Sequence, residues 1–302
     1  MQTQAHARPI RHFQPSLPEE GAYVVKTLES PDKYDDREGF DPKFLGVSTP
    51  LPHLGRLVTD AVKLEHGRGV ELKYANFSTI QSRSRRLPFF SACNIDGAQR
   101  EKEPRSNRWR FDPRISTEHQ ILEECYGSED RGLFSRGHMT RREDPVWGAR
   151  AEVAEEDTFL ATNCVPQMQS HNGGLWLSLE NYVLDNASED RQRACVITGP
   201  VLSHEDPVLY GVKIPVRLWK IIAFIHDETH ALAAVAYCSS QAGYLPDAFV
   251  WGQFRCLQVP VSRIADETGL DFGPLRAADV MAQADPSCTL LITKEEDLLL
   301  AG

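Results

Sequence analysis

Strand-like runs fill the middle of this sequence and do not alternate regularly with helical segments. Residues 74–82, 87–95 and 194–201 are rich in the aromatic, apolar and β-branched side chains that favour extended backbone. Residues 219–226 and 231–238 form two apolar runs joined by a short polar segment, which is the pattern of a β-hairpin. Residues 173–186 instead space their apolar side chains as a helix does. This irregular order favours an α+β fold over a parallel sheet of alternating strands and helices.

The length of 302 residues allows one large domain or two small ones. Residues 1–40 are polar and contain proline, so we expect an N-terminal arm or irregular extension there. We expect the main domain at residues 41–282 and a C-terminal tail at residues 283–302. No stretch approaches the roughly 18 apolar residues of a membrane span, and no secretory signal is visible at the N-terminus. The default expectation is a cytoplasmic protein without membrane association, with export by another route left open.

The net charge of -10 argues against a nucleic-acid-binding protein unless the basic residues gather in one cleft. For each basic cluster taken alone, a solvated charged loop is an equally good reading. Together they predict a positive cleft on an acidic body. The clustered residues are Arg83, Arg85, Arg86, Arg100, Lys102, Arg105, Arg108, Arg110, Arg114, Arg141 and Arg142.

Three short segments carry residues suited to phosphodiester hydrolysis, and they fall at residues 135–139, 162–167 and 171–180. Hydrolysis needs a base that takes a proton from water, and the imidazole of His138 titrates near neutral pH. It also needs positive charge near the phosphate, which Arg136 would supply. The amide oxygen of Asn172, together with waters, is a suitable ligand set for magnesium.

Glu180 follows Asn172 by eight residues, so the two would face roughly the same side of one helix. A carboxylate at Glu180 could then accept hydrogen bonds from water bound to the metal. The sequence thus predicts a strand-loop-helix site with the metal between His138 and the helix.

The order of these segments resembles the DNA/RNA non-specific endonuclease family, the ββα-metal-finger nucleases that include the Serratia nuclease and endonuclease G types. The family has an Asp-Arg-Gly-His box, then Asn-x-x-Pro-Gln, then Asn-x-Gly-x-Trp-x-x-Leu-Glu. The matching segments here are 135–138, 163–167 and 172–180, and the resemblance covers about residues 40–275. It implies a central, mostly antiparallel sheet flanked by helices.

The resemblance also implies a role for each matching residue. His138 would be the general base, Asn172 the direct ligand of Mg²⁺ or alternatively Mn²⁺, and Glu180 the residue that orients metal-bound water. Arg136 would contact the phosphate, and Asn163 would support the site.

A further family arginine lies just upstream of an aromatic-x-x-Asp-Pro segment, which leaves Arg105 and Arg108 as candidates. We add Arg141 and Arg110 to Arg136 as candidate substrate contacts. One residue departs from the family pattern, because Ser135 stands where the box has Asp, and this puts the local geometry in doubt.

The leading hypothesis is a metal-dependent, sequence-nonspecific endonuclease that hydrolyses DNA, RNA or both. The alternative is a nuclease-fold protein, catalytically weakened or conditionally activated, that binds nucleic acid or has a regulatory role. Ser135 and the negative net charge motivate this alternative. A homodimer, an inhibitor or an activator is compatible with both hypotheses.

A zinc peptidase is a poor alternative. His226 and His230 have the spacing of a zinc-binding helix, but Asp227 stands where that motif needs Glu, and the surrounding pattern is a hairpin. His204 is too distant along the chain to complete such a site.

Overall fold

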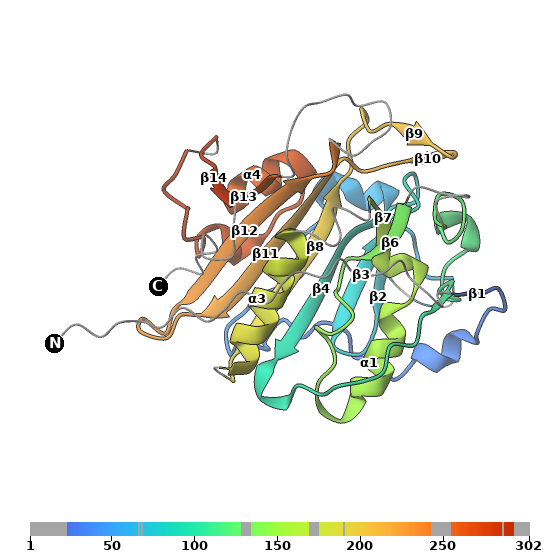
Figure 1. The fold of residues 1–302 in the computed structure, drawn as a ribbon, viewed down its shortest axis with the longest axis horizontal. Helices are drawn as coiled ribbons and strands as arrows, with labels where there is room; N and C mark the ends of the chain where they lie inside the picture. Colours follow the sequence, from blue (N-terminus) through green and yellow to red (C-terminus); the bar gives the residue numbers. More distant parts are fainter. Residues whose placement is uncertain are drawn as a thin grey trace, which may run out of the picture.

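A large antiparallel sheet forms the centre of the computed structural model (Figure 1), which describes residues 23–65, 67, 69–127, 134–168, 175–189, 191–242, 255–285 and 287–292. The sheet has eight strands in the order β14-β13-β12-β11-β8-β4-β3-β2, and every neighbouring pair is antiparallel. Its strands are β2 Glu71–Lys73, β3 Phe77–Gln81, β4 Pro88–Asp96, β8 Arg193–Val201, β11 Arg217–Ile225, β12 Leu232–Ser240, β13 Arg255–Val259 and β14 Leu290–Ile292.

Smaller elements surround the sheet. Strands β6 (Phe134–His138) and β7 (Cys164–Met168) pair as an antiparallel ribbon, and helix α3 (Leu175–Glu189) follows them. Helix α1 (Ala151–Thr158) is inserted between β6 and β7, and helix α4 (Val261–Thr268) follows β13. The other elements are β1 Tyr23–Val25, β5 Arg108–Arg110, β9 Val208–Leu209, β10 Val212–Lys213, and the 3-10 helices η1 Pro31–Tyr34, η2 Gly55–Asp60, η3 Gly97–Gln99, η4 Thr117–His119, η5 Gly148–Arg150, η6 Ala161–Asn163 and η8 Gly273–Arg276. The predicted α+β class is therefore confirmed.

Both faces of the sheet are buried. Side chains alternate between the faces along β11, so Leu218 and Ile222 pack in the core beneath α3, together with Val183 of that helix. Trp219 and Ile221 point the other way, into a second core that includes Ile264 of α4. Because neither face meets solvent, the strands read as nearly continuous apolar runs, and β4 is buried at every position.

Local signals place the ends of several elements where the sequence indicates them. Helix α4 begins after Pro260 and ends at Gly269, whose φ of +74° is the left-handed conformation that glycine adopts most easily. The predicted hairpin is β11–β12, and His226 and His230 lie in its turn rather than on a helix. The helical arrangement required by the zinc motif is thus not formed.

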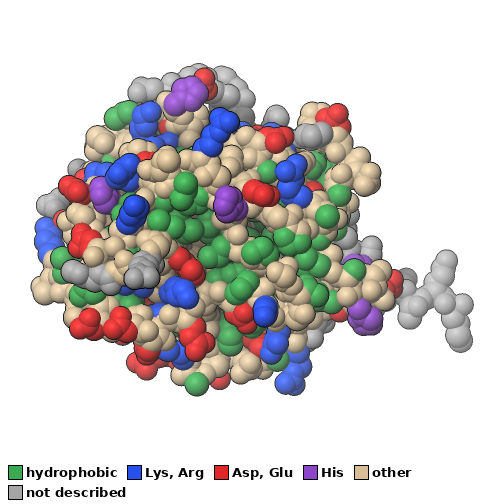
Figure 2. Space-filling view, turned by 180° about the vertical axis from the view of Figure 1, so that it is seen from behind, with side chains coloured by type: hydrophobic (Ala, Val, Ile, Leu, Met, Phe, Trp, Pro, Cys, Tyr) green, Lys and Arg blue, Asp and Glu red, His purple; other side chains and the backbone are tan. Residues whose placement is uncertain are grey.

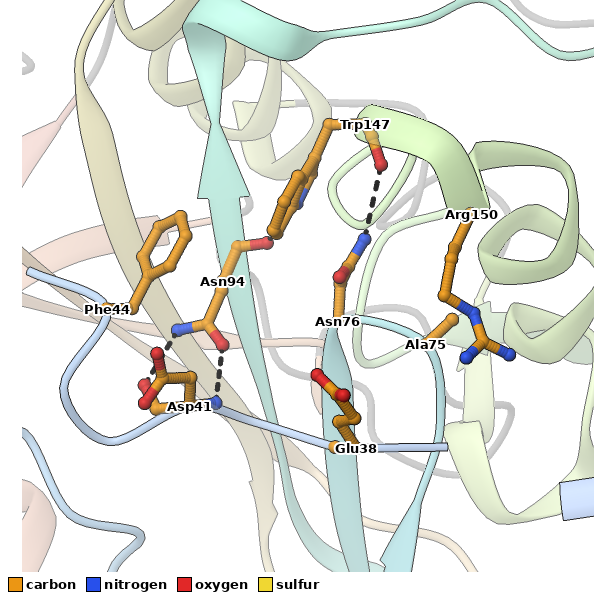
Figure 3. Close-up of a pocket in the computed structure, with 9 residues that line it drawn as sticks. Glu38, Asp41, Phe44, Ala75, Asn76, Asn94, Trp147 and Arg150 are labelled. Carbon is orange, nitrogen blue, oxygen red and sulfur yellow. Dashed lines mark hydrogen bonds between the residues drawn. The ribbon is translucent and has the colours of Figure 1, made fainter. Parts of the chain in front are cut away.

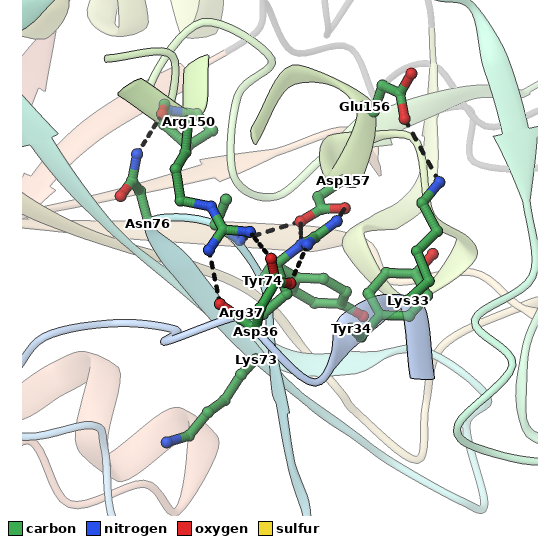
Figure 4. A network of polar contacts seen from close by, with 12 residues as sticks. Lys33, Tyr34, Asp36, Arg37, Lys73, Tyr74, Asn76, Arg150, Glu156 and Asp157 are labelled. Atoms are coloured by element: carbon green, nitrogen blue, oxygen red, sulfur yellow. Dashed lines mark hydrogen bonds and ion pairs between the residues drawn. The ribbon is translucent and has the colours of Figure 1, made fainter. Parts of the chain in front are cut away.

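The N-terminal segment is tied to the body by a buried ion pair (Figure 4). The Arg37 Nε donates to an oxygen of Asp157 in α1 at 2.7 Å, and the backbone N–H of Ala75 donates to the same oxygen at 3.1 Å. Tyr34 is also buried, and β1 pairs with β5. Residues 23–40 therefore pack against the body, while the boundaries predicted at residues 40 and 282 stay predictions.

Figure 2 shows the molecule from behind the view of Figure 1, with hydrophobic side chains at the centre of this face. Acidic and basic side chains are intermixed around them, so the described part of this face presents no extended field of positive charge. Among the described residues, no helix combines the length and the apolarity needed to cross a membrane.

We expect Arg37→Leu to lower the free energy of unfolding by about 3 kcal/mol, because Asp157 would be left buried without its ionic partner. Urea unfolding followed by circular dichroism measures this change. Arg150→Leu is the matched control, since the ion pair of Arg150 with Asp36 is solvent-exposed and should contribute little. Equal losses in the two variants would contradict this account of the N-terminal segment.

Candidate active site

His138 is the last residue of β6, and its imidazole packs against two buried aromatic rings. The ring centroids of Trp109 and Phe159 are 4.8 Å and 5.0 Å from that of His138. The Nε2 atom is buried and has no hydrogen-bond partner among the described residues. Burial lowers the pKa of His138 well below its usual 6.5, and the nearby charges of Arg105 and Arg142 lower this pKa further. The imidazole is therefore neutral at neutral pH, which is the form that accepts a proton.

Arg136 stands two residues before His138 on the same face of β6. Its guanidinium carbon lies 5.8 Å from the ring centroid of Trp109 and 5.0 Å from that of Tyr126. Its Nε and one terminal nitrogen both donate to the Leu122 carbonyl, at 3.0 and 2.8 Å. Trp109 thus contacts both residues, and the backbone of Leu122 fixes the orientation of the arginine.

The structure distinguishes the two upstream arginines. The guanidinium carbon of Arg105 lies 5.2 Å from the ring centroid of Phe159, the same ring that borders His138. Both arginines are exposed, but of the two only Arg105 has a described contact with a ring beside the histidine. Glu155 secures the segment that carries Arg105, because its carboxylate accepts the backbone N–H of Ser106 at 3.0 Å. Of the two candidates, Arg105 is the one placed beside the histidine.

Asn163 is fully buried and fixes the chain just beyond His138. Its side-chain oxygen accepts the N–H of Thr140 at 2.9 Å, and its side-chain nitrogen donates to the carbonyls of Thr140 and Thr158 at 2.9 and 3.1 Å. The Asn163 carbonyl also accepts the N–H of Met139 at 2.8 Å. All the side-chain hydrogen-bonding groups of Asn163 are thereby used to hold backbone.

Residues 135 and 137 shape the ribbon around the histidine. The Ser135 hydroxyl donates to the carbonyl of Gln167, its cross-strand partner, at 2.9 Å. An ionised aspartate could not make this bond, because a carboxylate has no proton to donate. A Cβ at Gly137 would lie 2.0 Å from the Gln167 side chain, so glycine is required for this close approach.

Glu180 lies on α3 in a second, buried group of charges. Its side chain is 8% exposed, and one carboxylate oxygen lies 3.3 Å from the Nζ of Lys220 on β11. Burial raises the pKa of Asp144 to about 7, although the charges of Lys220 and Arg141 act to lower it. Residues 138–144 therefore run from His138 to the group around Glu180.

Asn172 lies outside the described residues, so its predicted position on a helix face with Glu180 stays a prediction. Among the described residues, no group of three or more His, Cys, Asp or Glu side chains could hold a metal ion. The oxygen-rich pair of Glu180 and Asp144 suits a hydrated hard cation that keeps its own waters. The buried Nε2 of His138, which lacks a described partner, is also consistent with a water or ion at this site.

Several predicted substrate contacts are instead engaged in ion pairs within the fold. Arg110 is buried and its Nε lies 3.2 Å from an oxygen of Glu29. Arg141 donates from one nitrogen to Glu143 at 2.8 Å and to Asn181 at 2.7 Å. Other clustered arginines are paired in the same way, so the basic clusters do not all line one cleft. These pairs are Arg85 with Asp206, Arg86 with Glu124, and Arg114 with Asp112.

A separate pocket of 150 Å³ lies between residues 38–44 and the start of β3 (Figure 3). Its amide side chains already have partners: Asn94 accepts the N–H of Asp41 at 2.7 Å, and Asn76 donates to the Trp147 carbonyl at 3.4 Å. None of the predicted site residues lines this pocket. We therefore place the candidate site at His138 and not here.

Three charged residues near the site were not predicted as site residues. The sequence around Lys220 could have indicated its role, because a lysine between Trp219 and Ile221 in an apolar run is expected to be buried and to need a partner inside the protein. Asp144 and Arg142 carry no such signal, because charged residues in a polar segment are ordinarily solvated. Only the packing of that segment against β11, α3 and His138 reveals them.

Comparison with known proteins gives consistent matches. Residues 59–279 match the family model described as DNA/RNA non-specific endonuclease. The chain is 35% identical over 311 residues to the uncharacterized protein y4fB of Sinorhizobium fredii, covering 93% of this chain and 43% of that protein. It is 27% identical over 216 residues to the mitochondrial nuclease EXOG of Danio rerio, covering 67% of this chain and 60% of that protein. The chain thus spans less than two thirds of either relative.

The fold is similar to that of a solved structure, the EndoG/EndoGI complex that concerns the mechanism of EndoG inhibition. The TM-score is 0.53 at 20% sequence identity, and the match covers 76% of this chain and 94% of that one. At this level of identity the similarity supports the α+β nuclease fold and nothing finer.

We expect Asp144→Asn to stabilise the protein, and more so at about pH 8 than at about pH 5. The pKa of Asp144 is raised from 3.8 to about 7 on folding, so the folded protein favours the protonated acid. Its stabilising contribution is complete below 3.8 and falls as the pH rises to about 7, and the neutral amide avoids this loss. Urea unfolding at both pH values measures the difference, and an equal gain at both would contradict the assignment.

Proposed function

The chain belongs to the DNA/RNA non-specific endonuclease family, and from this premise we propose that it is a metal-dependent, sequence-nonspecific endonuclease acting on DNA, RNA or both. One observation supports the proposal most directly. A neutral His138 packs against Trp109 and Phe159, with Arg105 and Arg136 against the same two rings. A proton acceptor flanked by fixed positive charge is what phosphodiester hydrolysis requires.

In the proposed reaction, His138 accepts a proton from the attacking water as its oxygen bonds to phosphorus. The bond from phosphorus to the 3′ oxygen breaks, and this oxygen takes a proton from a solvent water as it leaves, which gives a 5′-phosphate and a 3′-hydroxyl. Arg105 and Arg136 hold the phosphate oxygens, on which negative charge grows as the bonds change. The two aromatic rings keep the imidazole in one orientation, so little reorganisation is needed during the reaction.

Asn172 would hold a divalent cation through its amide oxygen, and Glu180 would orient a water beside it, as the family resemblance implies. When bound, Mg²⁺ or Mn²⁺ supplies positive charge that stabilises the developing negative charge on the phosphate.

Contacts to backbone phosphates carry no base information, so we expect little sequence preference. We also propose that a partner restrains this activity, since an unrestrained cytoplasmic nuclease would attack the genome of its own cell. The EndoG whose fold this chain shares was solved with EndoGI, in a study of EndoG inhibition. An inhibitor, an activator or assembly as a homodimer would each provide such control.

Ser135 favours an active nuclease over the catalytically weakened alternative. Its hydroxyl bonds across the β6–β7 ribbon, so the replacement of the family Asp is accommodated by a new hydrogen bond.

The first test is cleavage of supercoiled plasmid and of a structured RNA with Mg²⁺, with Mn²⁺ and with EDTA. Wild type should cut only with a metal, and His138→Ala should lower the rate by about a thousandfold, because the proton acceptor is lost. His226→Ala, in the β11–β12 turn, is the control and should cut like wild type. A wild type that binds but never cuts would favour the regulatory alternative.

Arg105→Gln should lower kcat/KM by about tenfold or more, through loss of a charged contact to the phosphate. The positive charge of Arg105 also depresses the pKa of His138, so its removal should move the acidic limb of the pH profile to higher pH. Arg108→Gln is the matched control, because Arg108 is exposed like Arg105 but has no described contact with the rings at His138, so it should affect neither quantity strongly. Similar effects from both variants would contradict the choice of Arg105.

A further inference from the structure

Lys220 is a charged residue in the middle of an otherwise apolar buried strand. Its side chain is 1% exposed. An ammonium group removed from water is strongly destabilising unless it is paired and hydrogen-bonded. The Nζ donates to the Thr198 hydroxyl at 2.8 Å and lies 3.3 Å from a carboxylate oxygen of Glu180. The first contact lies within the sheet, and the second joins the sheet to α3.

The lysine belongs to a polar row that crosses the sheet beneath α3. Thr198 on β8 lies directly opposite Lys220 in the strand register, and Ser91 on β4 lies opposite Thr198. The hydroxyl of Ser91 is 2.6 Å from that of Thr140, which is held by Asn163 just beyond the base. The residues that fix the chain after His138 therefore lie on the same row as the partner of Glu180.

Stability alone does not account for this arrangement. Buried ion pairs can often be replaced by apolar side chains of similar size without loss of stability, whereas removal of one partner is destabilising. The neighbouring positions Leu218 and Ile222 show that this face of β11 accommodates apolar residues well. A lysine at position 220 is explained better by what it does to Glu180.

We propose that Lys220, anchored by Thr198, is a positioning residue for Glu180. This inference rests on the proposed function, in which Glu180 orients a water beside the cation. The ammonium group holds one carboxylate oxygen in place, so the other oxygen has a defined direction in which to accept a hydrogen bond. The charge of Lys220 also acts to lower the pKa of Asp144, whereas the charge of Glu180 acts to raise it.

The kinetic test compares Lys220→Met, Glu180→Gln and the double variant. Lys220→Met should lower kcat by about tenfold to a hundredfold, as for other outer-shell partners, with KM nearly unchanged. The double variant should be no slower than the slower single variant, because both substitutions remove the same interaction between Lys220 and Glu180. Losses that multiply in the double variant would overturn the proposal.

A second measurement does not depend on activity. In urea unfolding with EDTA, each single variant should lower the midpoint, and the double variant should lower it by less than the sum. The absence of such coupling would overturn the proposed pairing. Arg37→Leu is the structural control, because it breaks a buried ion pair elsewhere and should lose stability but keep its kcat.

Thr198 provides a test if Lys220→Met does not fold. Thr198→Ser keeps the hydroxyl that accepts from Lys220, whereas Thr198→Val removes it with little change in shape. We expect Ser to preserve kcat and Val to lower it, and equal rates would overturn the proposal. A wild type without cleavage would overturn the proposed function and this inference with it, whereas a cleaving wild type with an unaffected Lys220→Met overturns only the inference.

Discussion

The burial of the central sheet on both faces is the constraint on which the rest of the structure depends. A polar side chain in such a sheet cannot reach water, so it needs a partner inside the protein. Lys220 meets this need through Thr198 and Glu180, and Gln241 does so through the backbone of Met168, Pro166 and Pro215. These partnerships attach α3 and the β6–β7 ribbon to the sheet at defined places.

Two groups of arginines among the described residues of this acidic chain have different surroundings. One group lies in ion pairs that hold the fold together, as Arg37 does with Asp157 and Arg85 with Asp206. The other group lies around the imidazole, where Arg105 and Arg136 rest against the rings that enclose it. Local placement, rather than net charge, thus creates the positive surroundings of His138. The net charge of -10 is therefore compatible with a site that binds phosphate.

Much of the fold was predictable because the strand-like apolar runs and the helical spacing of apolar residues are both clear in the sequence. The hairpin and the strands of the sheet follow from apolar runs, and the helix expected at residues 173–186 is α3. The site was predictable only in part. His138, Arg136, Asn163 and Glu180 lie in motifs with fixed spacing, and the structure gives each a defined environment.

The remaining contacts depend on tertiary packing that no local pattern encodes. Arg105 and Arg108 are equivalent by spacing, and only the position of Phe159 separates them. Nothing near Arg110 in the sequence indicates that it is buried against Glu29, some eighty residues upstream. The environment of Asp144 likewise arises from β11 and α3, which are distant from it in the chain.

His138 lies on a two-stranded ribbon and not on the main sheet. The ribbon is held by its own cross-strand bonds, by Asn163 and by Gln241. Each of its strands pairs with one neighbour, whereas β8 and β11 in the sheet pair with a strand on both sides. Segments of this kind open locally at a lower free energy than the whole domain requires to unfold. Loss of catalytic geometry and loss of the fold are then separate events, and hydrogen exchange in β6 would outpace exchange in β8 or β11. The range of temperature or denaturant over which the site keeps its geometry would then be set by the ribbon. The sheet would stay folded beyond that range.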